Sequence, residues 1–233
     1  MDILCIWEHN ANDTLLHVAN LPGAYTRGCD LSAARSKMES EVRSYLRWAD
    51  MEQPEEISVQ IVQDVPCALA IHDADSDVLF ACEEEELNIS EYMRLKHLVL
   101  KSAADFHTLY ASIPKPDVSC SPLRQTFYGQ VPRTAREMYI HTRNVNDYYF
   151  GEIGVETNHE GTILECRERG FQTLEQNPDF LRNTLFEGSY GESWNVRKML
   201  RRFLWHDRIH AKAMYRMAQK TFGCPPPCNP FYF

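Results

Sequence analysis

From Leu87 onward the chain repeats apolar residues with the period of an α-helix. Apolar positions recur every three or four residues, a spacing that places them on one helix face. Proline or glycine interrupts the pattern at Pro114, Pro116, Gly154 and the Gly188/Gly191 stretch. The pattern therefore predicts four amphipathic helices, near residues 89–112, 132–152, 161–176 and 194–221. Four such helices with mostly modest connections predict a four-helix bundle.

The first 86 residues alternate apolar and polar positions in the way of short strands. Strands are predicted at 3–8, at 14–19 and, after the Leu21-Pro22-Gly23 turn, near 24–28. Asp30 is a good N-cap for a helix that has one apolar face, made by Leu31, Ala34, Met38, Val42, Tyr45 and Leu46. A further strand is predicted at 57–62, and a hairpin over 65–80 that turns at residues 73–77. These elements predict an α+β fold for this part.

This order of elements, with Leu-Pro-Gly-Ala-Tyr-Thr-Arg-Gly-Cys-Asp-Leu-Ser-Ala-Ala leading into the helix, resembles the small domain of HicB-like antitoxins. The resemblance covers about residues 1–65. Proteins of that family usually carry a separate DNA-binding element, and nothing in this sequence looks like one. The antitoxin function is therefore not carried over to this chain.

Charge is divided unevenly along the sequence. Residues 1–86 contain 5 Lys and Arg against 18 Asp and Glu, whereas the remaining residues contain 19 against 15. So acidic a region repels phosphate backbones, which argues against nucleic acid as its partner. The charge break coincides with the change of periodicity near Glu83–Leu87. Two domains with separate cores are predicted, residues 1–86 and residues 87–233, the second ending in a Pro-rich tail.

A pair of histidines, His206 and His210, lies four residues apart in the last predicted helix. Residues at this spacing are neighbours on one helix face, so both imidazoles can reach the same ion. A helical projection places both among its apolar residues and places the basic ones on the opposite, solvated side. Buried imidazoles need partners for their ring nitrogens, which are either carbonyls and carboxylates or a shared metal ion.

A third candidate ligand is His141, which projects onto the inner edge of the apolar stripe of the helix predicted at 132–152. The other six histidines lie on solvated helix faces, in strands or in loops. Asp207 is expected either to accept a hydrogen bond from an imidazole and so orient it, or to form a surface salt bridge. Tyr149 lines the pocket or packs in the core. Cys166 is the nearest rival for a fourth ligand.

A helical bundle with His141 in its second helix and His206-x-x-x-His210 in its fourth resembles the DinB-like superfamily, over roughly residues 87–222. The resemblance implies a divalent metal, zinc or nickel, on these three residues. Many members follow the second histidine of the pair with Arg-Gly, whereas this chain has Ala211-Lys212. The departure leaves the three ligands intact and leaves the subfamily undetermined.

The expected function is that of a metal-dependent enzyme of this type, either a transferase of low-molecular-weight thiols or a hydrolase. Three histidines leave coordination positions open, so the ion can activate a water or bind a thiolate without a protein nucleophile. The alternative is a non-catalytic binding or stress-response module that its metal stabilises. An antitoxin-like regulator is a third reading, which the charge of residues 1–86 opposes.

The cysteines and the hydropathy of the chain indicate its cellular compartment. The eight cysteines contain no Cys-x-x-Cys pair, which is typical of a reducing compartment. No apolar run approaches 18 residues and no basic leader precedes an apolar segment, so a cytoplasmic protein is expected. The expected partner is a small-molecule substrate, such as a cellular thiol, with no membrane and no nucleic acid; a homodimer is left open.

Overall fold

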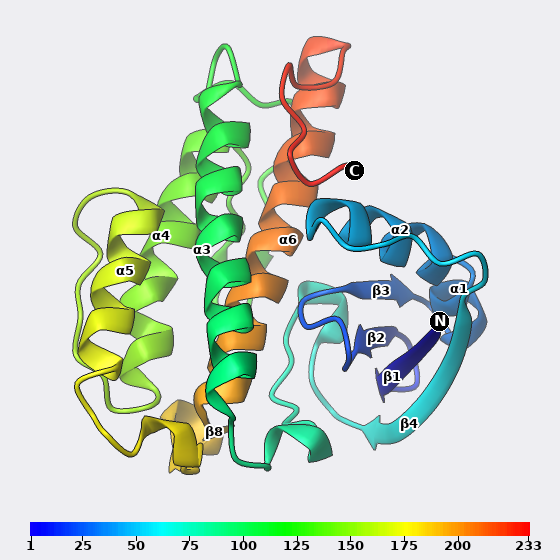
Figure 1. Cartoon of the computed structure of the whole chain (residues 1–233). Coiled ribbons are helices and arrows are strands. Elements are labelled where there is room, and N and C mark those ends of the chain that lie inside the picture. The colour runs from blue at the N-terminus through cyan, green and yellow to red at the C-terminus, as the bar shows by residue number, and fades with distance from the viewer.

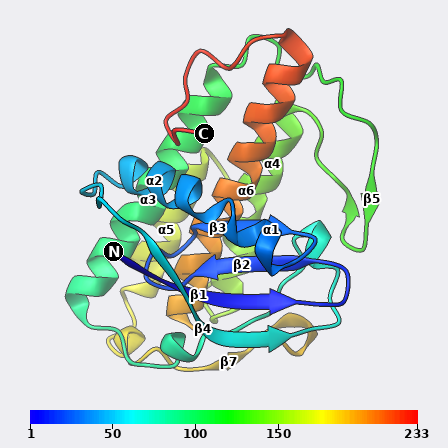
Figure 2. The same ribbon diagram turned by 90° about the vertical axis from the view of Figure 1, so that its right-hand side faces the viewer.

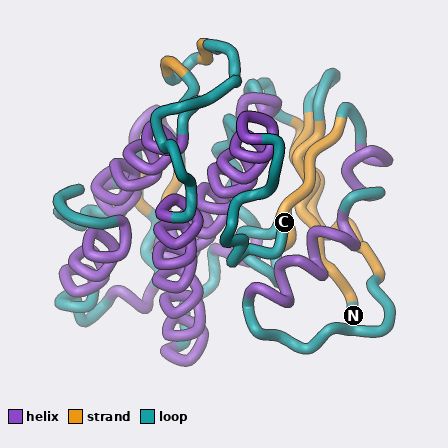
Figure 3. The backbone as a smooth tube through the Cα atoms, turned by 90° about the horizontal axis from the view of Figure 1, so that it is seen from above, coloured by secondary structure: helices purple, strands orange, loops and turns teal.

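The structure is a computed structural model that describes residues 1–233, and it has an α+β architecture (Figure 1). A four-stranded sheet gathers on one side of the molecule and four long helices on the other (Figure 3). The strands are β1 (Asp2–His9), β2 (Thr14–Val18), β3 (Tyr25–Gly28), β4 (Ser58–Pro66), β5 (Gln125–Thr126), β6 (Gly129–Gln130), β7 (Phe186–Glu187) and β8 (Ser193–Trp194). The α-helices are α1 (Leu31–Arg35), α2 (Met38–Trp48), α3 (Ile89–Ala111), α4 (Ala135–Gly151), α5 (Ile163–Leu174) and α6 (Val196–Phe222). Short 3-10 helices lie at Ile71–Asp73, Ala81–Glu83, Phe180–Arg182 and Ser189–Gly191.

The sheet has the order β3-β2-β1-β4. β1 pairs with β2 and β2 with β3 in antiparallel register, whereas β4 runs parallel to β1 after the crossover through α1 and α2. The predicted hairpin over 65–80 is wrong. β4 continues to Pro66, and the following segment forms a 3-10 helix at Ile71–Asp73 with no returning strand. The closely spaced aspartates at 73, 75 and 77 belong to a loop rather than to a turn between paired strands.

The helix predicted after Asp30 is divided into two. The Asp30 carboxylate accepts a hydrogen bond from the Ala33 backbone N–H, as expected of an N-cap, but α1 ends at Arg35 and α2 begins only at Met38. The predicted apolar face is nevertheless the buried one. It packs against the sheet through Ala34, Met38, Val42, Tyr45 and Leu46.

The four long helices begin and end within three residues of the predicted bounds. α4 and α5 begin at capping boxes, in which Thr134 and Thr162 exchange hydrogen bonds with the glutamate three residues later. Arg197 of α6 pairs with Glu91 of α3, so these two helices start at the same end; Tyr139, early in α4, stacks on Tyr110, late in α3. α4 therefore runs opposite to α3 and α6. None of the helices combines the length and the apolar character needed to cross a bilayer.

Helix α6 is buried on both sides. It contacts α3 and α4 on one side, and on the other it passes behind the sheet (Figure 2). The backbone of Gly23, in the β2–β3 turn, lies so close to α6 that an added Cβ would stand 2.5 Å from Leu204 Cβ. Buried apolar residues from residues 1–86 and from the helices form one continuous cluster of 41. Separate cores for the two regions are therefore not observed.

The basic residues of α6 were expected to face solvent, and for four of them this is wrong. Lys198, Arg201, Arg202 and Arg208 are buried because residues 1–86 cover the face that carries them. Acidic residues of that region supply the ion-pair partners of two of them, Arg201 and Arg208. Arg201 pairs with Glu83, while Arg208 and Lys212 both pair with Glu41, at 3.0 and 2.6 Å. The acidic region before residue 87 and the basic helix α6 after it are therefore complementary in charge, and they meet in the interior of the protein.

We predict that Glu41→Gln lowers the free energy of unfolding by about 3 kcal/mol, because it leaves Arg208 and Lys212 buried without their carboxylate. Urea unfolding followed by circular dichroism measures the change. The matched control is Glu39→Gln, on an exposed face of the same helix, where the pair with Arg43 lies in solvent. This control should cost less than about 1 kcal/mol. Equal, small effects of the two substitutions would show that the buried pairs do not stabilise the fold.

Candidate metal centre

The structure brings His141, His206 and His210 together. His141 is in the second turn of α4, and His206 and His210 are on successive turns in the middle of α6. Because α4 packs against α6, the single histidine of one helix faces the pair on the other. One candidate ligand atom from each of the three lies within 4.8 Å of the others. The three residues predicted from the sequence are therefore neighbours in space.

The imidazoles are arranged around a common point. His141 Nε2 and His206 Nε2 are 3.1 Å apart. The ring centroids are separated by 5.0 Å for His141–His206, 4.6 Å for His141–His210 and 4.4 Å for His206–His210. His206 is buried, whereas His141 and His210 are partly exposed. The cluster can thus be reached from solvent on one side.

Burial keeps all three imidazoles neutral near pH 7. Desolvation lowers the pKa of His141, and it lowers those of His206 and His210 well below 6.5. Their mutual repulsion when charged lowers the pKa of His206 and His210 further. Neutral imidazoles with free lone pairs are the form that binds transition metals.

The surroundings of the three imidazoles fit ligands of a divalent cation better than core histidines whose ring nitrogens are hydrogen-bonded to the protein. No carboxylate contacts the three rings, and the buried Nδ1 of His206 has no hydrogen-bond partner. The one hydrogen bond within the group joins His141 Nε2 and His206 Nε2, so it satisfies one nitrogen of each of these two rings and leaves His210 without a partner. Cys166, the rival fourth ligand, lies outside the group, and its Sγ contacts the Glu160 carbonyl at 3.3 Å. Imidazole ligands suit zinc, copper, iron and nickel, a set that includes the two metals implied by the resemblance.

Asp207 does not orient an imidazole, nor does it lie at the surface. Its carboxylate is fully buried and forms two hydrogen bonds with the Arg167 guanidinium of α5, the longer of them 2.7 Å. Arg167 also donates to the Val99 carbonyl and to Asn146 Oδ1, so this pair ties α6 to three other helices. Both expectations for Asp207 are therefore wrong. No sequence pattern indicated this pair, because Arg167 and Asp207 are forty residues apart.

Tyr149 is buried beside the cluster. Its ring meets that of His206 edge-on, with centroids 5.9 Å apart, and also packs against Trp194 and Phe203. Tyr149 therefore acts both as core and as a wall of the site. The residue that the sequence analysis missed is Arg202, whose guanidinium carbon lies 5.7 Å from the centre of the Tyr149 ring. The helical projection had placed it in solvent.

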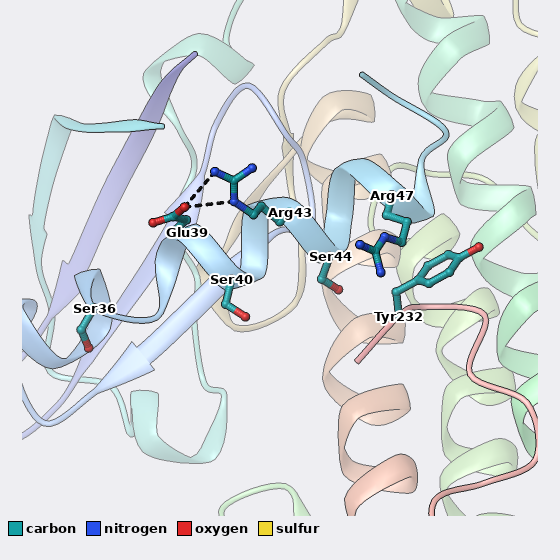
Figure 4. A pocket seen from close by; sticks show the side chains of 7 residues that line it. All are labelled: Ser36, Glu39, Ser40, Arg43, Ser44, Arg47 and Tyr232. Carbon is teal, nitrogen blue, oxygen red and sulfur yellow. Dashed lines mark hydrogen bonds and ion pairs between the residues drawn. The ribbon is translucent and has the colours of Figure 1, made fainter. Parts of the chain in front are cut away.

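A separate groove of about 500 Å³ lies along the outer face of α2, away from the histidines (Figure 4). Its lining is polar and mostly exposed, with Tyr232 from the C-terminal segment at one end. Glu39 and the carbonyl of Pro54 hold Arg43, and Ser44 donates to the carbonyl of Phe231. None of its lining side chains is buried, so we do not place a site here.

We compared the chain with protein-family models, with curated proteins and with solved structures, and none of the three comparisons found a match.

We predict that the metal-free protein loses stability as the pH falls from about 7 to about 5. An unfolded histidine titrates near 6.5, whereas the three clustered imidazoles have a lower pKa when folded. Below 6.5 the unfolded chain therefore binds protons first, and the free energy of unfolding decreases. Urea unfolding at pH 7.5 and 5.5 in the presence of a chelator measures the drop. It should shrink when His141, His206 and His210 are all replaced by Gln, and an unchanged drop would contradict the assignment.

Proposed function

We propose that this chain is a metal-dependent enzyme whose helices α3–α6 form a DinB-like four-helix bundle. His141, His206 and His210 hold one zinc or nickel ion. A bound ion of this kind supplies a Lewis acid that makes a coordinated water or thiol more acidic. The reaction class is transfer of a low-molecular-weight thiol to an electrophile, or hydrolysis. The substrate is a small molecule.

The observation that carries this proposal is the convergence of three uncharged imidazoles at a place open on one side. Two of the three rings are partly exposed, and no fourth protein ligand belongs to the group. Structural zinc sites usually close with a fourth protein ligand, whereas catalytic sites leave that position to solvent or substrate. The ligand set therefore favours catalysis.

The protein residues have supporting roles in this proposal. α6 fixes the spacing of His206 and His210, and the buried Arg167–Asp207 pair anchors α6 beside them. Tyr149 and the neighbouring apolar residues exclude water from the buried side of the site. Desolvation of the rings keeps them unprotonated and available as ligands at neutral pH.

The second candidate is a module that binds metal without turnover, either a binding or a stress-response protein. The observation that favours it is the mutual burial of residues 1–86 and α6, which makes the N-terminal region part of the interior rather than a free domain. In this reading the ion only strengthens the contact of α4 with α6.

We predict that the purified protein binds one equivalent of Zn²⁺ or Ni²⁺, and that His210→Ala weakens binding on the order of a hundredfold or more by removing one of three ligands. Isothermal titration and elemental analysis measure this. His97→Ala, at an exposed position of α3, is the matched control and should bind like the wild type. Metal binding that survives His210→Ala would overturn the site.

We further predict that His210→Ala abolishes turnover while the helical fold remains. Metal-loaded wild type should first be screened with small electrophiles and several cellular thiols, and with esters and amides in water. Activity and thermal unfolding are then compared in wild type, His210→Ala and His97→Ala. If removal of metal unfolds the wild type and no substrate is converted, the structural module is the correct reading.

A further inference from the structure

Six basic residues of α6 are buried or partly buried, and five of them pair with carboxylates. The pairs are Arg197–Glu91, Lys198–Glu192, Arg201–Glu83, Arg208–Glu41 and Lys212–Glu41. The sixth, Arg202, has no ion-pair partner although only 9% of its surface is exposed. A buried guanidinium without an anion is costly, because the lost hydration is not replaced.

The contacts of Arg202 leave one edge of its guanidinium free. Nη1 donates to the backbone carbonyl of Ser76, which is its one hydrogen bond, and Nε is buried without a partner. The guanidinium carbon lies 5.0 Å from the ring centre of Trp205 and 5.4 Å from that of Trp194. The Nε and Nη2 edge therefore lacks an acceptor, and in a guanidinium this is the edge that binds a carboxylate through two parallel hydrogen bonds.

The nearby acidic side chains have partners of their own, although Oε1 of Glu8 is buried without one. Glu8 accepts hydrogen bonds from Ser76 Oγ at 2.7 Å and contacts His17 Nε2 at 3.2 Å. Glu192 lies 2.9 Å from the ammonium of Lys198. Neither forms an ion pair with Arg202. Their charges help to raise the pKa of Arg202, but no neighbouring residue gives its guanidinium a direct carboxylate partner.

Arg202 is also adjacent to the candidate metal centre. It precedes His206 by four residues, so the two side chains leave the same face of α6 one turn apart. The Tyr149 ring contacts both of them, on the histidine side at 5.9 Å and on the arginine side at 5.7 Å. The Tyr149 ring therefore lies between the histidines and Arg202 and touches both.

We propose that Arg202 binds a carboxylate of the substrate, so that the site accepts small molecules carrying a carboxylate at one end and their metal-binding group, such as a thiol, at the other. The inference rests on the proposed function and adds the chemical class of the substrate to it. Arg202 is then a specificity-determining residue: it selects and orients the substrate without taking part in bond making or breaking.

The test compares thiols that differ only in the far end. Co²⁺-loaded protein is titrated with 3-mercaptopropionate and 3-mercapto-1-propanol, and with the longer pair 6-mercaptohexanoate and 6-mercapto-1-hexanol. Thiolate-to-cobalt absorption reports binding at the histidines. Two chain lengths are used because the distance from the ion to Arg202 determines which acid can contact both. In at least one pair, the acid should bind the wild type about tenfold or more tightly than the alcohol, since charge-assisted bidentate hydrogen bonds are strong.

The variant Arg202→Gln should abolish this preference. Arg202→Lys should reduce it, because lysine keeps the charge but lacks the planar group that donates two parallel hydrogen bonds. Arg197→Gln is the matched control, because it removes the same charge from the same helix at a position that pairs with Glu91. It should retain the preference. Co²⁺ affinity itself should be similar in all four proteins.

The outcomes separate the two proposals. If the wild type does not bind Co²⁺ through its histidines, the proposed function fails. If Co²⁺ binds but acid and alcohol bind equally at both lengths, the role of Arg202 is overturned while the metal centre stands. A preference that survives in both Arg202 variants overturns it as well. Should these variants fail to fold, the wild-type comparison alone decides.

Discussion

The burial of α6 on both sides is the constraint on which the rest of the structure depends. One face of this helix packs against α3 and α4, and the other carries basic side chains into the acidic N-terminal region. Glu41 and Glu83 are far from α6 in sequence, yet they supply the anions that allow Arg201 and Arg208 to be buried. The same placement holds His206 and His210 opposite α4, so the interior that unites the two regions also positions the candidate site.

The sequence was sufficient for the parts of the fold that local periodicity determines. The four long helices, most strands and the His206/His210 pair follow from spacing alone, because a helix face is a property of residues a few positions apart. That His141 belongs with this pair was implied by the DinB-like resemblance. The sequence did not indicate which neighbours cover each face. Arg202 and Asp207 were misplaced for this reason, since their burial depends on segments that are distant along the chain. The uneven charge of the two regions was visible, but it was taken as a boundary rather than as complementarity.

The two family resemblances concern different parts of the chain. The HicB-like likeness of residues 1–65 concerns a region whose sheet is covered by α6 through Trp205, next to His17 and Tyr25. The DinB-like likeness concerns the histidines themselves. Arg202 lies where these two parts of the chain meet, and neither resemblance includes it. In this account the N-terminal region acts as a wall of the site, and it contributes the Ser76 carbonyl that holds the guanidinium in place.

The central claim is that His141, His206 and His210 bind one ion between α4 and α6. Crystals grown with Zn²⁺ and measured on both sides of the zinc absorption edge test it most directly, because the anomalous signal locates the ion independently of any assumed ligand. The account predicts a single strong anomalous peak at about 2.0–2.1 Å from one nitrogen of each histidine. A peak bound elsewhere, or a His141 ring turned away from the other two with zinc present, would contradict it.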